Sequence, residues 1–393
     1  MSCVVVVKKG GLKSLAQGHP WVYAQSVARV EGRARPGEVV RLVDAEDRFL
    51  AWAWFNPQSY IRARLLERRE EVEPDLAWLE RRLAEAVERR RGLAESGHGA
   101  YRLVNAEADG LPGLIVDRYG PGLTLQALSA GAESVKHQVA GWLETGLAPE
   151  WIWERSDQEV RRLEGLEPAT GPLLGRPPER LRVDEPGCAY WVEPTAGQKT
   201  GFFLDQRDNR RLVAGLAAGR EMLDCFCYSG GFALRGLLAG AARATLVDSS
   251  AQALALAQEN LALNGVRERA QLVRANVFNQ LRAYRDEGRR FGLIVLDPPK
   301  LAPNRASLAK AARAYKDVNM MALRLLPPGG LLATFSCSAA MDRQSFWEVL
   351  TWAAEDAGAR LQVLHQLSQP ADHPALLGFA ESQYLKGLVL RRL

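Results

Sequence analysis

The 393-residue sequence contains few cysteines and no long apolar run. Its five cysteines are scattered and odd in number, and no two form a Cys-x-x-Cys pair, which argues against a disulfide framework and against a zinc site. The longest apolar runs are much shorter than the ~18 residues that span a membrane. We therefore expect a soluble protein of two or three domains, without disulfides, bound metal or membrane contact.

The start of the chain also lacks the pattern of an export signal. Residues 1–10 contain a short β-branched run, Val4 to Val7, followed by two lysines. An export signal would instead show a charged start and an apolar core of about 7–15 residues. A cytoplasmic location is the resulting expectation.

The chain has a small excess of positive charge, and this excess lies in its N-terminal segment. The formal net charge is +5, from 51 Lys and Arg against 46 Asp and Glu. Residues 1–66 hold ten basic and five acidic side chains, so the rest of the chain is balanced. This distribution favours contact between the N-terminal segment and a polyanion such as RNA.

The pattern of apolar residues divides the chain into three predicted domains. Short β-like runs separated by Gly- and Pro-containing turns predict a β-rich domain over residues 1–70. An α/β middle domain is predicted over 71–180, opening with a helix at 76–91 whose Arg and Glu residues are interleaved, as on a solvated, salt-bridged face. The expected strands are 4–7, 38–43, 49–55 and 60–66 in the first domain and 113–119, 123–128 and 151–156 in the second, with a helix at 133–147.

Residues 181–393 alternate short apolar runs with helical patterns. This rhythm is typical of a mostly parallel, doubly wound sheet, so we expect an α/β fold for the third domain. The expected strands are 220–226, 244–248, 270–274, 293–297 and 331–336, and the clearest helices are 251–263 and 307–326.

A glycine-containing loop follows the first of these runs. Residues 223–232 read Leu-Asp-Cys-Phe-Cys-Tyr-Ser-Gly-Gly-Phe. Glycines just after a strand allow a tight turn and close approach of the backbone to a ligand. The spacing is not Gly-x-Gly-x-x-Gly, which disfavours a nicotinamide or flavin dinucleotide.

An acidic residue, Asp248, ends the second run, 18 residues beyond Gly230. A carboxylate at that place can accept hydrogen bonds from two ribose hydroxyls of an adenosine-bearing ligand. The alternative is that Asp248 caps the helix beginning near Ala251.

The fourth run ends in Asp297-Pro-Pro-Lys300, a rigid loop suited to holding a flat base or an amine. An adenosine cofactor without pyrophosphate beside Asp-Pro-Pro points to S-adenosylmethionine and methyl transfer.

The fifth run ends at Cys337. The carboxyl ends of neighbouring parallel strands share one edge of a sheet, so we expect Cys337 beside the glycine loop and Asp297. A thiolate that adds to C6 of cytosine makes C5 able to attack a methyl group. An ordinary thiol has a pKa of about 8.5, so Cys337 needs a helix terminus or a cation, for which Lys300 is a candidate. The alternative is a buried structural cysteine, which is how we interpret Cys225 and Cys227.

Several segments together resemble the bacterial PUA-domain-containing 23S rRNA cytosine-C5 methyltransferases over nearly the whole chain. The resemblance implies a PUA-like RNA-binding domain over 1–70, the middle domain over 71–180 and a Rossmann-like class I methyltransferase domain over 181–393. The segments that carry it are 197–207, 225–232, 297–300, 336–338 and 384–387, with 18–23 in the first domain and 103–105 and 110–114 in the second.

The resemblance also implies roles for individual residues. Cys337 is implied as the nucleophile. Asp297 is expected to accept from the cytosine amine, and the alternatives are that it binds the cofactor or acts only as a helix cap. Asp248 is expected on the ribose, and Asn276 stands near the adenine where similar proteins often have aspartate. The implied cofactor-binding residues are Lys199, Asp205, Arg207, Phe226, Tyr228, Ser229, Gly230, Asp248, Asn276 and Asp297.

The implied partner is 23S rRNA or a large-subunit assembly intermediate. The target cytosine must be unpaired or extruded, because a stacked base cannot be approached from both faces. The basic N-terminal domain is expected to contact the RNA backbone. The sequence leaves open which cytosine is modified, which base removes the C5 proton, and the oligomeric state, a homodimer included.

Two alternatives remain at this point. The same cofactor could serve methylation of an exocyclic amine on adenine or guanine, a reaction that needs no thiol and would survive replacement of Cys337 by serine. The chain could also be a non-catalytic rRNA-binding assembly factor. Such a factor would transfer no methyl group and would be indifferent to changes at Asp248.

Overall fold

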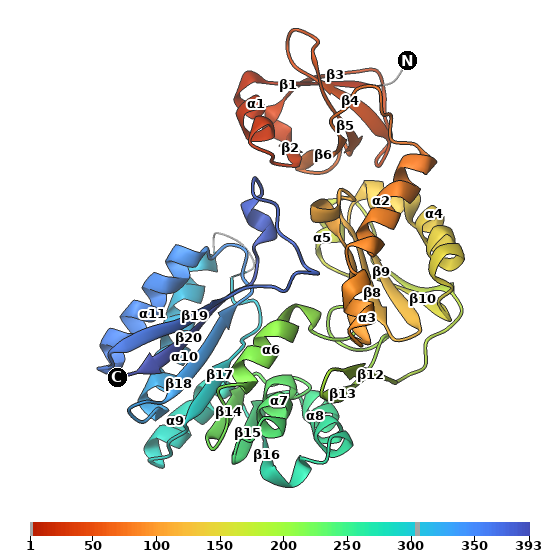
Figure 1. Ribbon diagram of the computed structural model, residues 1–393. Coiled ribbons are helices and arrows are strands. Elements are labelled where there is room, and N and C mark those ends of the chain that lie inside the picture. Colours follow the sequence, from red (N-terminus) through yellow and green to blue (C-terminus); the bar gives the residue numbers. More distant parts are fainter. Residues whose placement is uncertain (1–2, 303–306) are drawn as a thin grey trace. The chain divides into compact units, whose positions relative to one another are not determined.

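The computed structural model describes residues 3–302 and 307–393 (Figure 1). These residues form two compact units, which we call the N-terminal unit and the C-terminal unit. The N-terminal unit comprises Met1–Pro186, Val192–Leu204 and Ala371–Ser382, and the C-terminal unit comprises Gly187–Trp191, Asp205–Pro370 and Gln383–Leu393.

The first sheet of the N-terminal unit has six strands in the order β2-β6-β5-β4-β1-β3. All four predicted runs are strands here, but β2, β3 and the short helix α1 were not predicted. β2 is only three residues long, and four of the five side chains of β3 are exposed, so neither shows apolar alternation. The bounds are β1 Val4–Val7, α1 Lys9–Ala16, β2 Trp21–Tyr23, β3 Val27–Glu31, β4 Val39–Val43, β5 Phe49–Phe55 and β6 Ile61–Glu67.

The second sheet of the same unit has five strands in the order β11-β10-β9-β8-β7. The predicted helix from Leu76 is confirmed, and Asp75 caps it by accepting from the Trp78 amide at 2.8 Å. The helix predicted from residue 133 begins three residues earlier, because Ser129 is its cap. The bounds are α2 Leu76–Glu88, α3 Arg91–Glu95, β7 Ala100–Asn105, β8 Leu114–Tyr119, β9 Gly122–Ala127, α4 Ala130–Leu147, β10 Trp151–Ser156, α5 Val160–Leu163 and β11 Ala169–Leu174.

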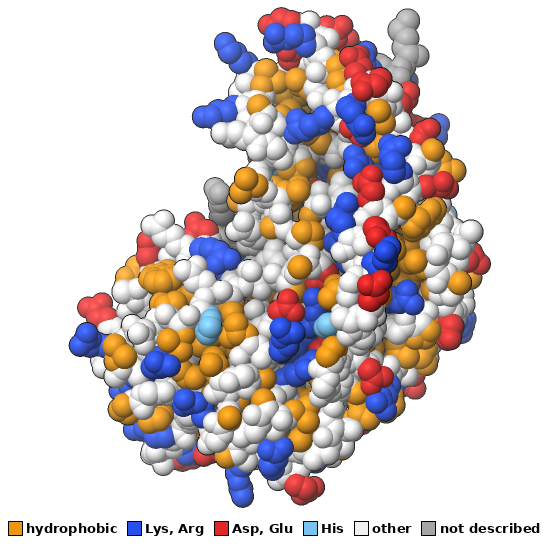
Figure 2. Space-filling model, viewed as in Figure 1, with side chains coloured by type: hydrophobic (Ala, Val, Ile, Leu, Met, Phe, Trp, Pro, Cys, Tyr) orange, Lys and Arg blue, Asp and Glu red, His pale blue; other side chains and the backbone are white. Residues whose placement is uncertain are grey.

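The arginines of α2 and α3 mostly form ion pairs on the surface, as predicted. Arg82 pairs with Glu85 at 3.1 Å, and Arg91 pairs with Glu88 at 2.9 Å. Figure 2 shows basic and acidic side chains alternating along these helices. Arg90 is different, because it is buried and forms two hydrogen bonds of 2.7 Å with the Asp109 carboxylate. These arginines are therefore structural.

The C-terminal unit contains a seven-stranded sheet in the order β16-β15-β14-β17-β18-β20-β19. The first five strands are parallel, and β20 and β19 are antiparallel to their neighbours, which confirms the doubly wound α/β expectation. Figure 1 shows helices on both faces of this sheet. The bounds are α6 Arg207–Ala214, β14 Glu221–Cys225, α7 Gly231–Leu238, β15 Arg243–Asp248, α8 Ala251–Leu263, β16 Ala270–Arg274, α9 Val277–Asp286, β17 Leu293–Leu296, α10 Leu308–Leu325, β18 Leu331–Ser336, α11 Arg343–Ala357, β19 Leu361–Leu367 and β20 Lys386–Arg392.

Burial explains which strands of this sheet were predictable. All residues of β17 and β18 are buried, because helices cover both faces, and such strands read as continuous apolar runs. The edge strand β19 is mostly exposed and partly polar, and it gave no such run. Two further strands of the described ranges are β12 Leu181–Glu185 and β13 Cys188–Val192. Within the described ranges, no helix is both long enough and apolar enough to cross a membrane.

Candidate active site

Strand pairing brings most of the predicted site residues to one edge of the parallel sheet. Cys225 of β14 pairs with Leu296 of β17, and Leu296 pairs with Thr334 of β18. On the other side, Cys225 pairs with Val247 of β15. The residues that follow these positions therefore lie at the same edge. They are the 226–230 loop, Asp248, Asp297 and Cys337.

The 226–230 loop has an unusual backbone. Phe226, Tyr228 and Gly230 have φ values of 59°, 47° and 76°, in the left-handed region that non-glycine residues rarely adopt. Such conformations persist only where the surroundings enforce them, and they are common at ligand sites. Gly230 is required here, because a Cβ would lie 2.9 Å from the Leu246 side chain.

Asp248 holds this loop from the neighbouring strand. Its Oδ2 accepts from the Tyr228 amide at 3.0 Å, and its Oδ1 accepts from the Ser250 amide at 2.9 Å. The cap of α8 is Ser250, which accepts from the Ala253 amide, so the alternative that Asp248 caps this helix is wrong. Asp248 is only partly buried, and each carboxylate oxygen has a second lone pair that can accept from a ribose hydroxyl.

A second acid, Asp224, lies beneath the loop and was not identified from the sequence. Its side chain is buried, and Oδ2 accepts from the Ala233 amide at 2.9 Å. Oδ1 is buried without a hydrogen-bond partner among the described residues. Burial, and then the negative charges of Asp297 and Asp248, raise the pKa of Asp224 to about 8. An acid next to the end of an apolar strand, directly before the loop, was the available signal.

The raised pKa of Asp224 predicts a pH-dependent cost to stability. An unfolded aspartate ionises near pH 4, so the folded state loses relative stability as the pH rises from about 4 to about 8. We expect Asp224→Asn to raise the free energy of unfolding by about 2 kcal/mol at pH 8, and by less at pH 5. Urea unfolding at both values would test this. A difference from wild type that does not change with pH would show that the carboxyl ionises normally.

Cys337 follows β18 directly and is partly exposed between two buried serines. The Tyr315 hydroxyl, from α10, lies 3.0 Å from the Ser336 hydroxyl and 3.2 Å from the Ser338 hydroxyl. The Ala302 amide also donates to the Ser338 hydroxyl at 3.1 Å. This network fixes the backbone on both sides of the cysteine, and the two buried serines leave Cys337 as the accessible side chain of the turn.

The other two cysteines near the loop are poor nucleophiles. Cys225 and Cys227 are buried, and burial raises the pKa of both thiols well above the ordinary value. The structural interpretation of this pair is therefore consistent with their surroundings. None of the five cysteines, all within the described ranges, forms a disulfide.

A second lysine, which the sequence analysis did not single out, lies beside the 336–338 turn. Lys300 is exposed to solvent. Lys386, at the start of β20, is 3% exposed and donates to the Ser338 carbonyl at 2.8 Å. Lys386 could not be predicted as a neighbour of this turn, because the position of β20 beside β18 depends on long-range pairing.

The other residues predicted to bind the cofactor differ from one another in burial and in hydrogen-bond partners. Asp205 is buried and accepts from the Tyr384 hydroxyl at 2.9 Å, and Arg207 is buried at the start of α6. Asn276 is exposed and caps α9, accepting from the Asn279 amide at 3.3 Å. Lys199 belongs to the N-terminal unit, where its ammonium lies 4.4 Å from the centre of the Phe203 ring. Ser229 is buried in the loop, and its carbonyl accepts from Asn260.

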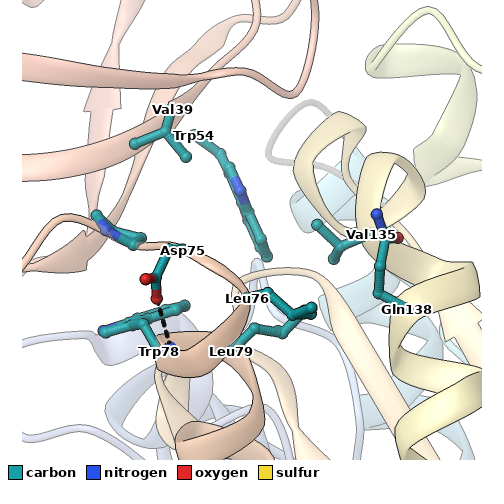
Figure 3. A pocket seen from close by; sticks show the side chains of 9 residues that line it. Val39, Trp54, Asp75, Leu76, Trp78, Leu79, Val135 and Gln138 are labelled. Atoms are coloured by element: carbon teal, nitrogen blue, oxygen red, sulfur yellow. Dashed lines mark hydrogen bonds between the residues drawn. The ribbon is translucent and has the colours of Figure 1, made fainter.

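A cavity of about 190 Å³ elsewhere is not part of this edge. It belongs to the N-terminal unit, where Trp54 and Val39 face Leu76, Leu79 and Val135 (Figure 3). Its lining is mostly apolar and has no nucleophile. Among the described residues there is also no group of three or more His, Cys, Asp or Glu side chains placed to hold a metal ion.

Comparison with known proteins identifies the family. Residues 5–68 match the model of a PUA-like domain, and residues 144–391 match that of an S-adenosylmethionine-dependent methyltransferase. The chain is 44% identical over 392 residues to the ribosomal RNA large subunit methyltransferase I of Klebsiella pneumoniae (strain 342), covering 98% of both chains. It is 43% identical over 395 residues to the protein of the same name from Escherichia coli O9:H4 (strain HS), covering 100% of both.

Solved structures show the same fold. A SAM-dependent methyltransferase from Streptococcus mutans superimposes with a TM-score of 0.85 at 21% identity, and a methyltransferase complexed with SAH superimposes with a TM-score of 0.86 at 22% identity. Each match covers 99% of both chains. The chain belongs to the S-adenosylmethionine-dependent methyltransferase family, in the group of the ribosomal RNA large subunit methyltransferase I proteins.

Proposed function

We propose that this chain methylates C5 of a cytosine in 23S rRNA and that Cys337 is the nucleophile. The observation that carries the proposal is a partly exposed thiol directly after β18, at the sheet edge that also holds the 226–230 loop, Asp248 and Asp297. Methylation of an exocyclic amine needs no such thiol. The relatives named as large-subunit rRNA methyltransferases support the choice of RNA.

The residues at this edge fit an adenosine-bearing methyl donor. Asp248 has lone pairs for two ribose hydroxyls, and its Oδ2 also holds the 226–230 loop by accepting from the Tyr228 amide. We propose that Asn276, which caps α9 just after β16, contacts the adenine through its side-chain amide. We further propose Lys199, Asp205 and Arg207 as cofactor-binding residues. When bound, S-adenosylmethionine supplies an electrophilic methyl group.

The chain's own groups account for the remaining steps. The Cys337 thiolate adds to cytosine C6, which moves the ring electrons so that C5 can form a bond to the methyl carbon. The Asp297 carboxylate accepts from the exocyclic amine and orients the ring. Loss of the C5 proton to a base then restores the double bond and expels the thiolate. Asp297 or an ordered water is the candidate base.

The N-terminal domain, residues 1–70, is proposed to contact the RNA backbone through its excess of basic side chains. The other proposed domains are the middle domain over 71–180 and the methyltransferase domain over 181–393. The partner is 23S rRNA, free or in a large-subunit intermediate, and the reaction would take place in the cytoplasm, where such RNA is found.

The test is methyl transfer from tritium-labelled S-adenosylmethionine to unmodified rRNA, followed by nucleoside analysis. We expect label in 5-methylcytosine from 23S rRNA and none in 16S rRNA. Label in N6-methyladenine or N2-methylguanine would show that the target is an exocyclic amine and not C5 of cytosine. No label in any rRNA, with the cofactor bound, would support a non-catalytic assembly factor.

A further inference from the structure

A buried lysine lies beside the proposed nucleophile. Lys386 is the first residue of β20 and pairs with Ser336, the last residue of β18. Its ammonium donates to the Ser338 carbonyl at 2.8 Å and to the Tyr384 carbonyl at 2.9 Å. The side chain is 3% exposed, so the charge is held in one place next to the 336–338 turn.

Burying a lysine is costly, and here only part of its bonding capacity is used. An ammonium has three N–H donors, and two of them reach the carbonyls just described. Within the described ranges no protein acceptor takes the third. Two neutral carbonyls could equally be satisfied by a neutral amide, which would not carry the cost of burying a charge. The positive charge therefore calls for a reason beyond backbone hydrogen bonding.

Cys337 is one of three charged or ionisable groups that act on Lys386. Burial lowers the pKa of Lys386 to about 8, the Cys337 thiolate raises it, Arg343 lowers it and Asp342 raises it. Asp342 already accepts from the Ser345 amide at 2.7 Å as the cap of α11. On the other side, Tyr315 is close enough to Cys337 and Asp297 for both negative charges to raise its pKa, after the larger effect of burial. The electrostatic interaction is reciprocal, so the ammonium also favours the thiolate.

We propose that Lys386 is a positioning residue that fixes the 336–338 turn and stabilises the thiolate form of Cys337. The inference rests on the proposed function, in which that thiolate attacks cytosine. The thiol proton passes to solvent, which leaves an ammonium and a thiolate as a pair. Lys300, which is exposed, would be screened by water and would add much less.

The test measures alkylation of Cys337 by iodoacetamide against pH, with the Cys337 peptide followed by mass spectrometry. Lys386→Gln keeps an N–H donor for the carbonyls and removes the charge, whereas Lys386→Arg keeps the charge. We expect the alkylation midpoint of Lys386→Gln to rise by about one pH unit, with about tenfold slower reaction at pH 7. Lys386→Arg should stay closer to wild type. Identical profiles for wild type and Lys386→Gln would overturn the proposal, because a purely structural lysine would change stability and not the profile.

A second measurement does not depend on any variant folding. In the wild-type chain, the midpoint for Cys337 should be lower in the native state than in the same chain unfolded in urea, and equal midpoints would refute the proposal. These results can be separated from a failure of the proposed function. If Cys337→Ser still methylates RNA, the thiol is not the nucleophile, yet the alkylation profiles still report whether Lys386 acts on it.

Discussion

Cys337→Ser is expected to lower 5-methylcytosine formation by a factor on the order of 10³ or more, as does removal of a nucleophile in other covalent enzymes. A serine hydroxyl keeps the size of the side chain but is hardly ionised at neutral pH, so addition to cytosine C6 should nearly stop. The network of Tyr315 with Ser336 and Ser338 does not involve the Cys337 side chain, so the turn should keep its shape. Binding of S-adenosylmethionine, measured by calorimetry, should be unchanged.

Cys188→Ser is the matched control for this experiment. Cys188 is also partly exposed and outside any disulfide, but it lies on β13 and not at the edge of the parallel sheet. Its replacement should leave the rate within about twofold of wild type. A Cys337→Ser variant that methylates rRNA at the wild-type rate would contradict the covalent mechanism. The modified nucleoside would then show whether an exocyclic amine is the target.

RNA carrying 5-fluorocytosine at the target gives a direct view of the adduct. Fluorine replaces the C5 proton that must be lost, so the thiolate cannot be expelled after methyl transfer. Wild-type protein and cofactor should give a complex that survives denaturing electrophoresis, and Cys337→Ser should give none. A complex with the serine variant would place the covalent bond on another residue.

The parallel sheet could be predicted from sequence because its physical signal is local. Strands such as β17 and β18 are buried on both faces and read as apolar runs, and each is followed by a residue that the pattern marks, Asp297 or Cys337. Once the strands are known to be parallel neighbours, the convergence of their carboxyl ends follows. The glycine loop, Asp248 and Asp-Pro-Pro pointed to S-adenosylmethionine, and the resemblance to known methyltransferases supplied the RNA target.

The parts of the site that were missed depend on contacts between distant residues. Lys386 lies 49 positions after Cys337 in the sequence and reaches the 336–338 turn only because β20 pairs antiparallel with β18. Asp224 could be seen at a strand end, but its raised pKa depends on burial and on two other acids from different strands. Local patterns therefore predicted which residues follow the strands of the parallel sheet, whereas the surroundings of Asp224 and Lys386 required the folded chain.

Asp297→Ala is expected to reduce kcat by about 100-fold, or about 2.7 kcal/mol of transition-state stabilisation. Asp297 follows β17. This strand lies between β14, which precedes the 226–230 loop, and β18, which precedes Cys337. Its negative charge contributes to raising the pKa of Asp224 and the pKa of Tyr315. A side chain in this position can orient the cytosine between the methyl donor and the nucleophile.

Asp297→Asn separates the hydrogen bond of this side chain from its charge. The amide can still accept from the cytosine amine and can donate to N3, but it cannot carry a negative charge or take a proton. We expect a loss of kcat between those of wild type and Asp297→Ala, measured in single turnovers at saturating cofactor. Asp286→Asn, an exposed aspartate at the end of α9, is the control. If both Asp297 variants instead bind S-adenosylmethionine weakly but turn over normally at saturation, Asp297 is a cofactor ligand, and the cytosine must be oriented by another group at this edge.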